Sequence, residues 1–121
     1  MNYTRPKTIF CDIDGTLVKH YSPDINSKPD FDLTLLPGTL ETLREWDRKG
    51  YNIILVTGRR ESMRQVTEEQ LKKIGIFYDK LIMGIGGGQR VIINDFKPDS
   101  DEPTAAHFCL KRNEGISNLN L

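Results

Sequence analysis

The chain has 121 residues, with 17 basic and 17 acidic side chains and a formal net charge of zero. A general nucleic-acid or polyanion binder carries a basic excess, so this balance argues against that class of protein. The length is typical of one small domain, and we expect residues 1–121 to form a single domain that needs no disulfide or structural metal.

The N-terminal sequence has no apolar signal core, and no apolar run reaches the length of a membrane span. These features predict a cytoplasmic protein with no membrane partner. The two cysteines, Cys11 and Cys109, lie in apolar segments, and we expect both to be buried free thiols.

Strands and helices are expected to alternate along the chain. Runs of β-favouring side chains predict the strands, and apolar residues at helical spacing, each series ended by a glycine, predict the helices. The expected strands are residues 7–11, 51–56, 80–83, 91–93 and 105–110, and the expected helices are residues 39–50 and 61–74. This order predicts an α/β fold in which helices cover a parallel sheet and the crossovers are right-handed.

Two connecting segments carry no regular pattern. Residues 19–36 are polar, contain two prolines and show no helical period, so we expect an irregular excursion or a small β-flap. Residues 84–90 (GIGGGQR) match neither of the common glycine-rich nucleotide fingerprints. We interpret them as a tight crossover.

Polar side chains follow three of the predicted strands. Asp12 and Asp14 follow the first strand, residues 57–59 (Thr-Gly-Arg) follow the second, and residues 94–95 (Asn-Asp) follow the fourth. Because the carboxyl ends of parallel strands lie along one edge of a sheet, these side chains are expected to converge there.

The chemistry of these residues indicates phosphoryl transfer. An extended backbone directs Asp12 and Asp14 to one face, where like charges repel and are costly to bury. A divalent cation would relieve the repulsion, and Asp95 would complete an oxygen-rich site suited to Mg²⁺. Thr57 and Gly58 precede a predicted helix and offer a hydroxyl and backbone N–H groups to an anion. A carboxylate nucleophile, a hard cation and an anion pocket together favour an aspartyl-phosphate mechanism.

The segments FCDIDGTLV, LVTGR and IIND resemble, in that order, motifs I, II and IV of the haloacid dehalogenase-like (HAD) phosphohydrolases. The resemblance covers residues 7–99. It implies a Rossmann-like, three-layer α/β domain and a Mg²⁺-dependent phosphatase. Members that act as dehalogenases lack the second aspartate, so dehalogenation is disfavoured.

By position, the resemblance implies a role for each site residue. Asp12 would be the nucleophile, and Asp14 would be the general acid and base. Asp12, Asp95 and the backbone carbonyl of Asp14 would hold Mg²⁺. The residues implied in binding the transferred phosphate are Thr16, Thr57, Gly58 and Arg59.

The motif III cation of the family has no clear match. Lys97 follows the fourth predicted strand at the expected edge, and we favour it over Lys80 and Arg90, which begin strands at the opposite edge. Asn94 stands where the family commonly has Gly or Asp, and Asp99 has the spacing of a second acidic member. Whether these two join the metal site stays open.

The insertion at residues 19–36 is short, and none follows motif II, so the chain resembles the capless members of the family, which have no cap domain. That resemblance implies a homo-oligomer whose leading substrate is a phosphorylated sugar or a similar small metabolite. Nucleic acid is disfavoured as a partner, although phosphorylated nucleic-acid ends and phosphoproteins stay open as substrates.

A HAD-like chain that binds a ligand with little turnover is another alternative. A signalling receiver domain is disfavoured because the third strand ends in Met83-Gly84, without an acceptor Asp.

Overall fold

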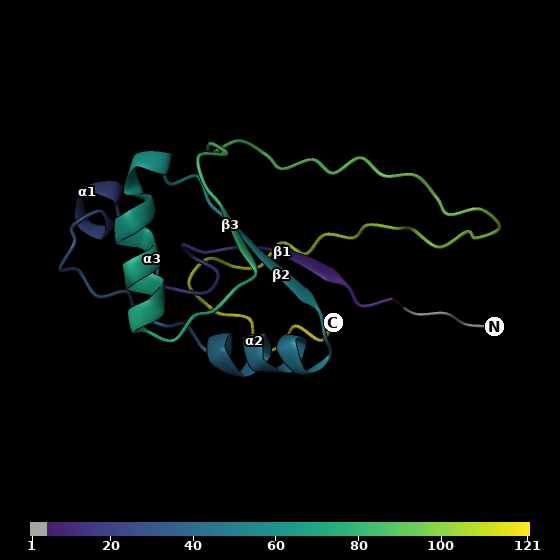
Figure 1. Cartoon of the computed structure of the whole chain (residues 1–121), viewed down its shortest axis with the longest axis horizontal. Helices are drawn as coiled ribbons and strands as arrows, with labels where there is room; N and C mark the ends of the chain where they lie inside the picture. The colour runs from purple at the N-terminus through teal and green to yellow at the C-terminus, as the bar shows by residue number, and fades with distance from the viewer. Residues whose placement is uncertain (1–4) are drawn as a thin grey trace.

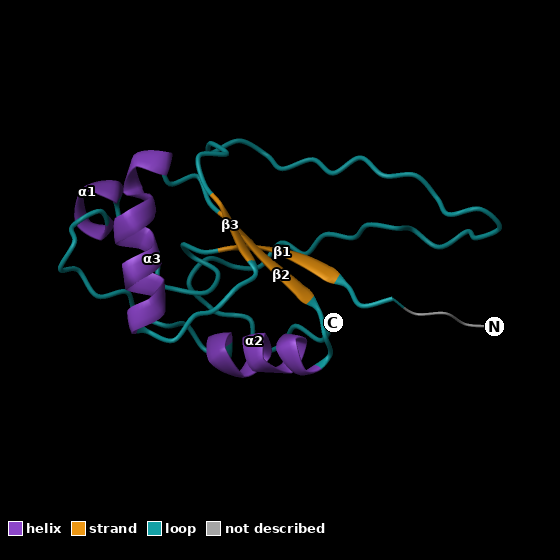
Figure 2. Cartoon of the chain, in the orientation of Figure 1, coloured by secondary structure: helices purple, strands orange, loops and turns teal. Residues whose placement is uncertain are grey.

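A computed structural model describes residues 5–121. Three parallel strands form one sheet in the order β1–β2–β3. Helical segments lie between the strands along the chain (Figure 2). The elements are β1 (Thr8–Asp12), α1 (Pro23–Asn26), α2 (Thr39–Arg48), β2 (Asn52–Val56), the 3-10 helix η1 (Glu61–Met63), α3 (Arg64–Lys73) and β3 (Lys80–Ile82). The predicted α/β class is confirmed, and no cap domain is evident in the described residues.

The parallel register aligns the strand ends. Asp12 pairs with Val56, and Val56 pairs with Ile82, so all three strands end at the same edge of the sheet. The middle strand β2 is buried at Ile53–Leu55, as expected for a parallel strand covered on both faces. The two main helices and the sheet share one core, whose fully buried members include Ile13, Leu17, Leu43, Trp46, Ile53, Leu55, Leu71 and Ile116.

The insertion at residues 19–36 is mostly irregular, as predicted. It contains the single turn α1 and one antiparallel bridge between Val18 and Leu35. Leu33 and Leu36 are buried, so the insertion is fastened to the core although most of its residues are polar.

The segment from residue 84 to residue 110, which we call the arm, differs from the prediction. Figures 1 and 2 show it running out from the end of β3 as an extended chain and then returning, with no helix or strand. The strands predicted at 91–93 and 105–110 are wrong, and residues 84–90 open the arm instead of making a tight crossover. Val91 is 71% exposed and Ile93 is 90% exposed. A β-favouring run becomes a strand only when a neighbouring strand pairs with it, and no strand among residues 5–121 pairs with the arm.

One of the two cysteines lies in the core and the other lies on the arm. Cys11 on β1 is buried, as predicted, whereas Cys109 on the arm is exposed, so that prediction is wrong for Cys109. No helix within residues 5–121 is long and apolar enough to cross a membrane.

Candidate active site

The turn after β1 exposes one carboxylate at the carboxyl edge of the sheet. Gly15 has a φ of +90°, a left-handed conformation that favours glycine. Its N–H donates to the carbonyl of Val18 at 2.7 Å, which reverses the chain. The hydroxyl of Thr16 donates to Oδ2 of Asp12 at 3.3 Å. Asp12 itself is exposed, so its carboxylate can meet an incoming substrate.

The electrostatic environment of Asp12 disfavours its ionised form. Although the residue keeps solvent access, partial burial of its carboxylate is the largest cause that raises its pKa, and the negative charge of Asp14 raises it further. Hydrogen bonds from the Ile13 N–H and the Thr16 hydroxyl oppose this rise, as does the positive charge of Arg90. A cation at this edge would stabilise the charged carboxylate.

Asp14 is held by Arg59 in a two-point ion pair. Nε of Arg59 donates to Oδ2 and Nη2 donates to Oδ1, both at 2.9 Å. The side chains of Arg59 and Asp14 are only 8% and 16% exposed. Nη1 of Arg59 donates to Thr67 at 3.1 Å and to Gln70 at 2.8 Å, both on α3. Sequence reasoning assigned Arg59 to the phosphate, but these four hydrogen bonds direct its guanidinium to Asp14 and α3 instead.

Thr57 and Gly58 lie at the end of β2, beside the end of β1. Thr57 is only 2% exposed, and its hydroxyl oxygen accepts a hydrogen bond from the Arg59 N–H at 3.1 Å. The carbonyl of Gly86, at the start of the arm, lies so close to Gly58 that a Cβ there would meet it at 2.8 Å. The absence of a side chain at position 58 therefore allows the arm to begin beside the strand ends.

Gly58→Ala is expected to lower the free energy of unfolding by about 1–3 kcal/mol, because backbone must shift to accept the added methyl group. Thermal denaturation measures the loss. Gly87→Ala is the matched control, since a Cβ at Gly87 meets nothing within 4 Å. Equal melting temperatures for the two variants would contradict the close approach.

The remaining predicted site residues lie on the arm, away from the strand ends. Asp95, Lys97 and their neighbours Asn94 and Asp99 are all exposed, and Asp95 accepts a hydrogen bond from Thr104 through its backbone carbonyl. The structure does not bring Asp95 to Asp12 and Asp14. Within residues 5–121 no three His, Cys, Asp or Glu side chains are grouped to hold a metal. The physical reason is that the predicted fourth strand, which would have carried Asp95 to this edge, is not formed.

Two of the three predicted metal donors are nevertheless at one place. The Asp12 carboxylate and the Asp14 backbone carbonyl are oxygen ligands of the kind that Mg²⁺ prefers. The three cations considered from the sequence, Lys80, Arg90 and Lys97, are all exposed, and Arg90 is the one whose charge lowers the pKa of Asp12.

Three residues that support this site through hydrogen bonds were not predicted from the sequence. Thr67 and Gln70 bind Arg59 from α3. Asn113, in the C-terminal segment, donates its N–H to the carbonyl of Gly15 at 2.8 Å and accepts from the His20 N–H at 2.7 Å. Gln70 had a signal, because it is a polar residue on the apolar face of a predicted helix. Asn113 lies in a segment with no periodic pattern.

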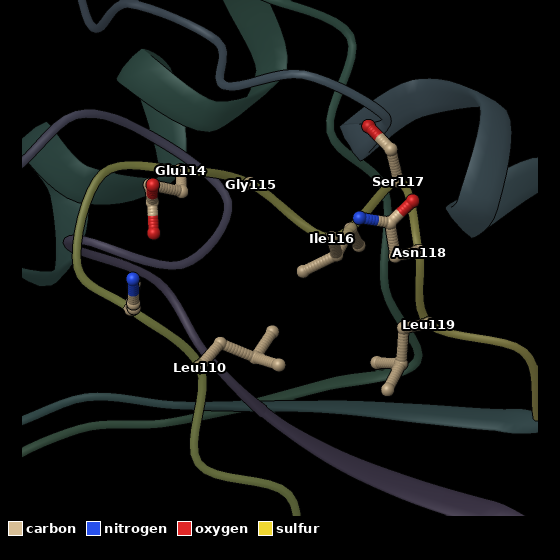
Figure 3. A pocket seen from close by; sticks show the side chains of 8 residues that line it. Leu110, Glu114, Gly115, Ile116, Ser117, Asn118 and Leu119 are labelled. Atoms are coloured by element: carbon tan, nitrogen blue, oxygen red, sulfur yellow. The ribbon is translucent and has the colours of Figure 1, made fainter.

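A hollow of about 360 Å³ lies elsewhere, along the C-terminal segment (Figure 3). Its lining runs from Leu110 to Leu119 and includes none of the residues at the strand ends. The hollow shares no residue with the exposed edge around Asp12, and we give it no role.

Comparisons with known proteins yield one family and several structures. The family described as HAD superfamily, subfamily IIIB (Acid phosphatase), matches residues 1–101. No curated protein matches the chain. Two structures of a Pnkp1/Rnl/Hen1 complex, one described as an RNA repair complex, contain chains 29% and 30% identical to this one, with TM-scores of 0.55 and 0.54. The matches cover 74% and 78% of this chain but only 32% and 28% of those chains. A Vibrio cholerae crystal structure that is 23% identical shares the fold, with a TM-score of 0.52 and coverage of 74% of this chain and 79% of that chain.

Proposed function

The chain belongs to the HAD superfamily, and from this membership we propose that it is a Mg²⁺-dependent phosphomonoester hydrolase that works through an aspartyl-phosphate. The observation that carries the proposal is the unequal state of two neighbouring carboxylates. Asp12 is exposed at the end of β1, while Asp14 is fixed by Arg59. An open carboxylate suits a nucleophile, and an oriented one suits a general acid and base.

In the proposed reaction, an oxygen of Asp12 attacks phosphorus as the bond from phosphorus to the leaving oxygen breaks. Asp14, once it has taken a proton from solvent onto one of its free lone pairs, gives that proton to the leaving oxygen, and it then takes a proton from the water that attacks the aspartyl-phosphate, which releases phosphate and restores Asp12. Each Asp14 oxygen accepts one hydrogen bond from Arg59 and keeps a second lone pair for this role.

We propose that Thr16, Thr57 and the backbone at Gly58 bind the transferred phosphate, since they lie at the strand ends around Asp12. Arg59 takes a positioning role, because its guanidinium is engaged with Asp14 and α3. We favour Arg90 as the charge-balancing cation, since its charge acts on Asp12, and Lys97 stays the alternative from sequence.

The proposed Mg²⁺ ligands are Asp12, the backbone carbonyl of Asp14 and Asp95. When bound, the cation would neutralise charge on the phosphate. Asp95 can join the other two ligands only if the arm moves toward the edge of β1 that does not pair with β2. Two observations support such a movement: β1 pairs only with β2 among the described residues, and the β-favouring residues 91–93 are exposed.

Mg²⁺ is expected to raise the melting temperature of the wild type, because a ligand that binds only the folded state stabilises it by about 2.7 kcal/mol at a concentration 100 times its Kd. Asp12→Asn should abolish the shift, Asp95→Asn should reduce it, and Asp101→Asn on the same arm should leave it unchanged. A full shift in Asp12→Asn would contradict the proposed metal site, and a full shift in Asp95→Asn would remove Asp95 from the ligands.

The leading substrate is a phosphorylated sugar or similar small metabolite. The similarity to chains of an RNA repair complex favours a second candidate, a phosphate at a nucleic-acid end. The zero net charge favours the first, because a backbone-binding protein gains affinity from basic side chains. The test is phosphate release from sugar phosphates, a 3′-phosphorylated RNA oligonucleotide and a phosphopeptide, each with Mg²⁺ and with EDTA. Binding of a sugar phosphate without any release would support the alternative of a HAD-like binding protein.

We also propose that the chain forms a homo-oligomer in the cytoplasm. The exposed apolar residues of the arm, Val91, Ile93 and Phe96, support self-association, since burial of exposed apolar side chains against a second chain is favourable. Sedimentation analysis of the wild type tests it, and a monomer at all concentrations would contradict it.

A further inference from the structure

Gln70 on α3 lies at the centre of a buried polar network that the proposed reaction does not use. Only 4% of the residue is exposed. Its Oε1 accepts from Nη1 of Arg59 at 2.8 Å. Its Nε2 donates to the backbone carbonyls of Asn26 at 2.8 Å and of Phe31 at 3.3 Å, both in the insertion. One amide group thus joins the partner of Asp14 to the insertion.

The orientation of this amide is fixed by its partners. The guanidinium of Arg59 only donates, so it must face Oε1. Backbone carbonyls only accept, so those of Asn26 and Phe31, and that of Lys28 at 3.5 Å, must face Nε2. The reversed amide would oppose donor to donor and acceptor to acceptor. Every buried side-chain nitrogen or oxygen within residues 5–121 has a hydrogen-bond partner. The network therefore has one satisfied arrangement, in which Arg59 and the insertion are both engaged.

Gln70 provides the buried polar contact between the insertion and α3. A second polar contact there is the ion pair of Lys73 with Asp32 at 2.6 Å, but both side chains are exposed. Exposed ion pairs contribute little to the free energy of folding, because water screens the two charges and the long side chains lose conformational entropy when they pair. The Gln70 hydrogen bonds are shielded from water, so their loss leaves carbonyls without partners.

We propose that Gln70 is a positioning residue that couples the docking of residues 26–31 on α3 to the orientation of Asp14, through Arg59. Its catalytic consequence rests on the proposed phosphatase function. Without Gln70, the Nη1 group of Arg59 keeps Thr67 as its partner, and the guanidinium gains freedom to turn away from Asp14. An acid that is no longer held in place delivers its proton less efficiently to the leaving oxygen.

Two variants distinguish the contact of Gln70 with Arg59 from its contact with the insertion. Gln70→Met removes both the acceptor and the donor at similar volume, whereas Gln70→Glu keeps an acceptor for Arg59 and removes the donor to the insertion. Gln65→Met is the matched control, because Gln65 is exposed on the same helix and contacts only Glu69 among the hydrogen bonds of its side chain.

The first readout compares kcat/KM on two esters that differ in their need for a proton, because kcat/KM reports on the transfer of phosphate to Asp12 and leaves out the later attack of water, which is the same for both esters. Para-nitrophenol leaves without protonation, whereas the alcohol of glycerol 2-phosphate needs a proton from the general acid. Gln70→Met should lose about tenfold or more on glycerol 2-phosphate and less than about threefold on para-nitrophenyl phosphate, since general acid catalysis contributes ~10²–10⁴-fold. Gln65→Met should match the wild type on both. Equal losses of Gln70→Met on both esters would overturn the positioning role.

The second readout needs no turnover. Solvent exchange of the Arg59 Nε–H, followed by NMR, reports on the ion pair with Asp14, and amide hydrogen exchange at residues 26–31 reports on the insertion. Gln70→Met should accelerate both, whereas Gln70→Glu should accelerate only the insertion. If the wild type hydrolyses neither ester, the phosphatase proposal fails and these rates alone decide the coupling. Rates unchanged in both variants would overturn it.

Discussion

Asp12→Asn is expected to lower phosphate release by at least about a thousandfold while the protein stays folded. The amide matches the carboxylate in size but cannot attack phosphorus, and loss of a nucleophile typically removes most of the rate enhancement. Steady-state assays of purified wild type and variant measure the loss. Asp47→Asn, at an exposed position on α2, is the matched control.

The same substitution should not lower the melting temperature in the absence of Mg²⁺. The pKa of Asp12 is raised, chiefly by partial burial, so the folded protein binds this proton more tightly than the unfolded chain does. The ionised form therefore costs stability at every pH above the raised pKa, and Asn removes that cost. An Asp12→Asn protein that keeps more than about a tenth of the activity would point to another nucleophile.

Arg59→Met is expected to lower the free energy of unfolding by about 3–5 kcal/mol, which is a large share of the stability of a small domain. The variant leaves Asp14 without its ionic partner, and it deprives Thr67 and Gln70 of their buried donor. Urea denaturation measures the change. Arg60→Met is the matched control, because Arg60 is the next residue and is exposed.

A double variant separates the unpaired charge from the rest of the loss. Asp14→Asn in the Arg59→Met background should restore part of the stability, because a neutral amide is less costly to leave without its ionic partner than a carboxylate. A loss in Arg59→Met no larger than that in Arg60→Met would contradict the buried ion pair.

The predictable part of the fold is the part that local pattern determines. Residues 53–56 of β2 are all apolar because both faces of a middle parallel strand are covered, and Leu43 and Trp46 follow the helical period because one face of α2 meets the core. The arm could not be predicted in this way. Residues 91–93 have the side chains of a strand, but a strand also needs a partner, and a short apolar run does not specify one.

The same distinction between local pattern and distant partners applies to the site. Asp12, Asp14 and Thr57 gather at one edge because parallel strands end together, and the strand order alone predicts this. Sequence reasoning placed Arg59 at this edge but gave it to the phosphate, because the true partners of a long side chain depend on elements distant in sequence. Gln70 could have been suspected, since a buried polar residue on an apolar helix face needs hydrogen-bond partners.

The most direct test of the central claim is phosphate release by the purified wild type from para-nitrophenyl phosphate, a panel of sugar phosphates, a 3′-phosphorylated RNA oligonucleotide and a phosphopeptide, with Mg²⁺ and with EDTA. We predict release that depends on Mg²⁺, stops in EDTA and returns when Mg²⁺ is restored. A folded protein that releases no phosphate from any of these esters in Mg²⁺, or that releases it equally well in EDTA, would contradict the proposed Mg²⁺-dependent phosphatase.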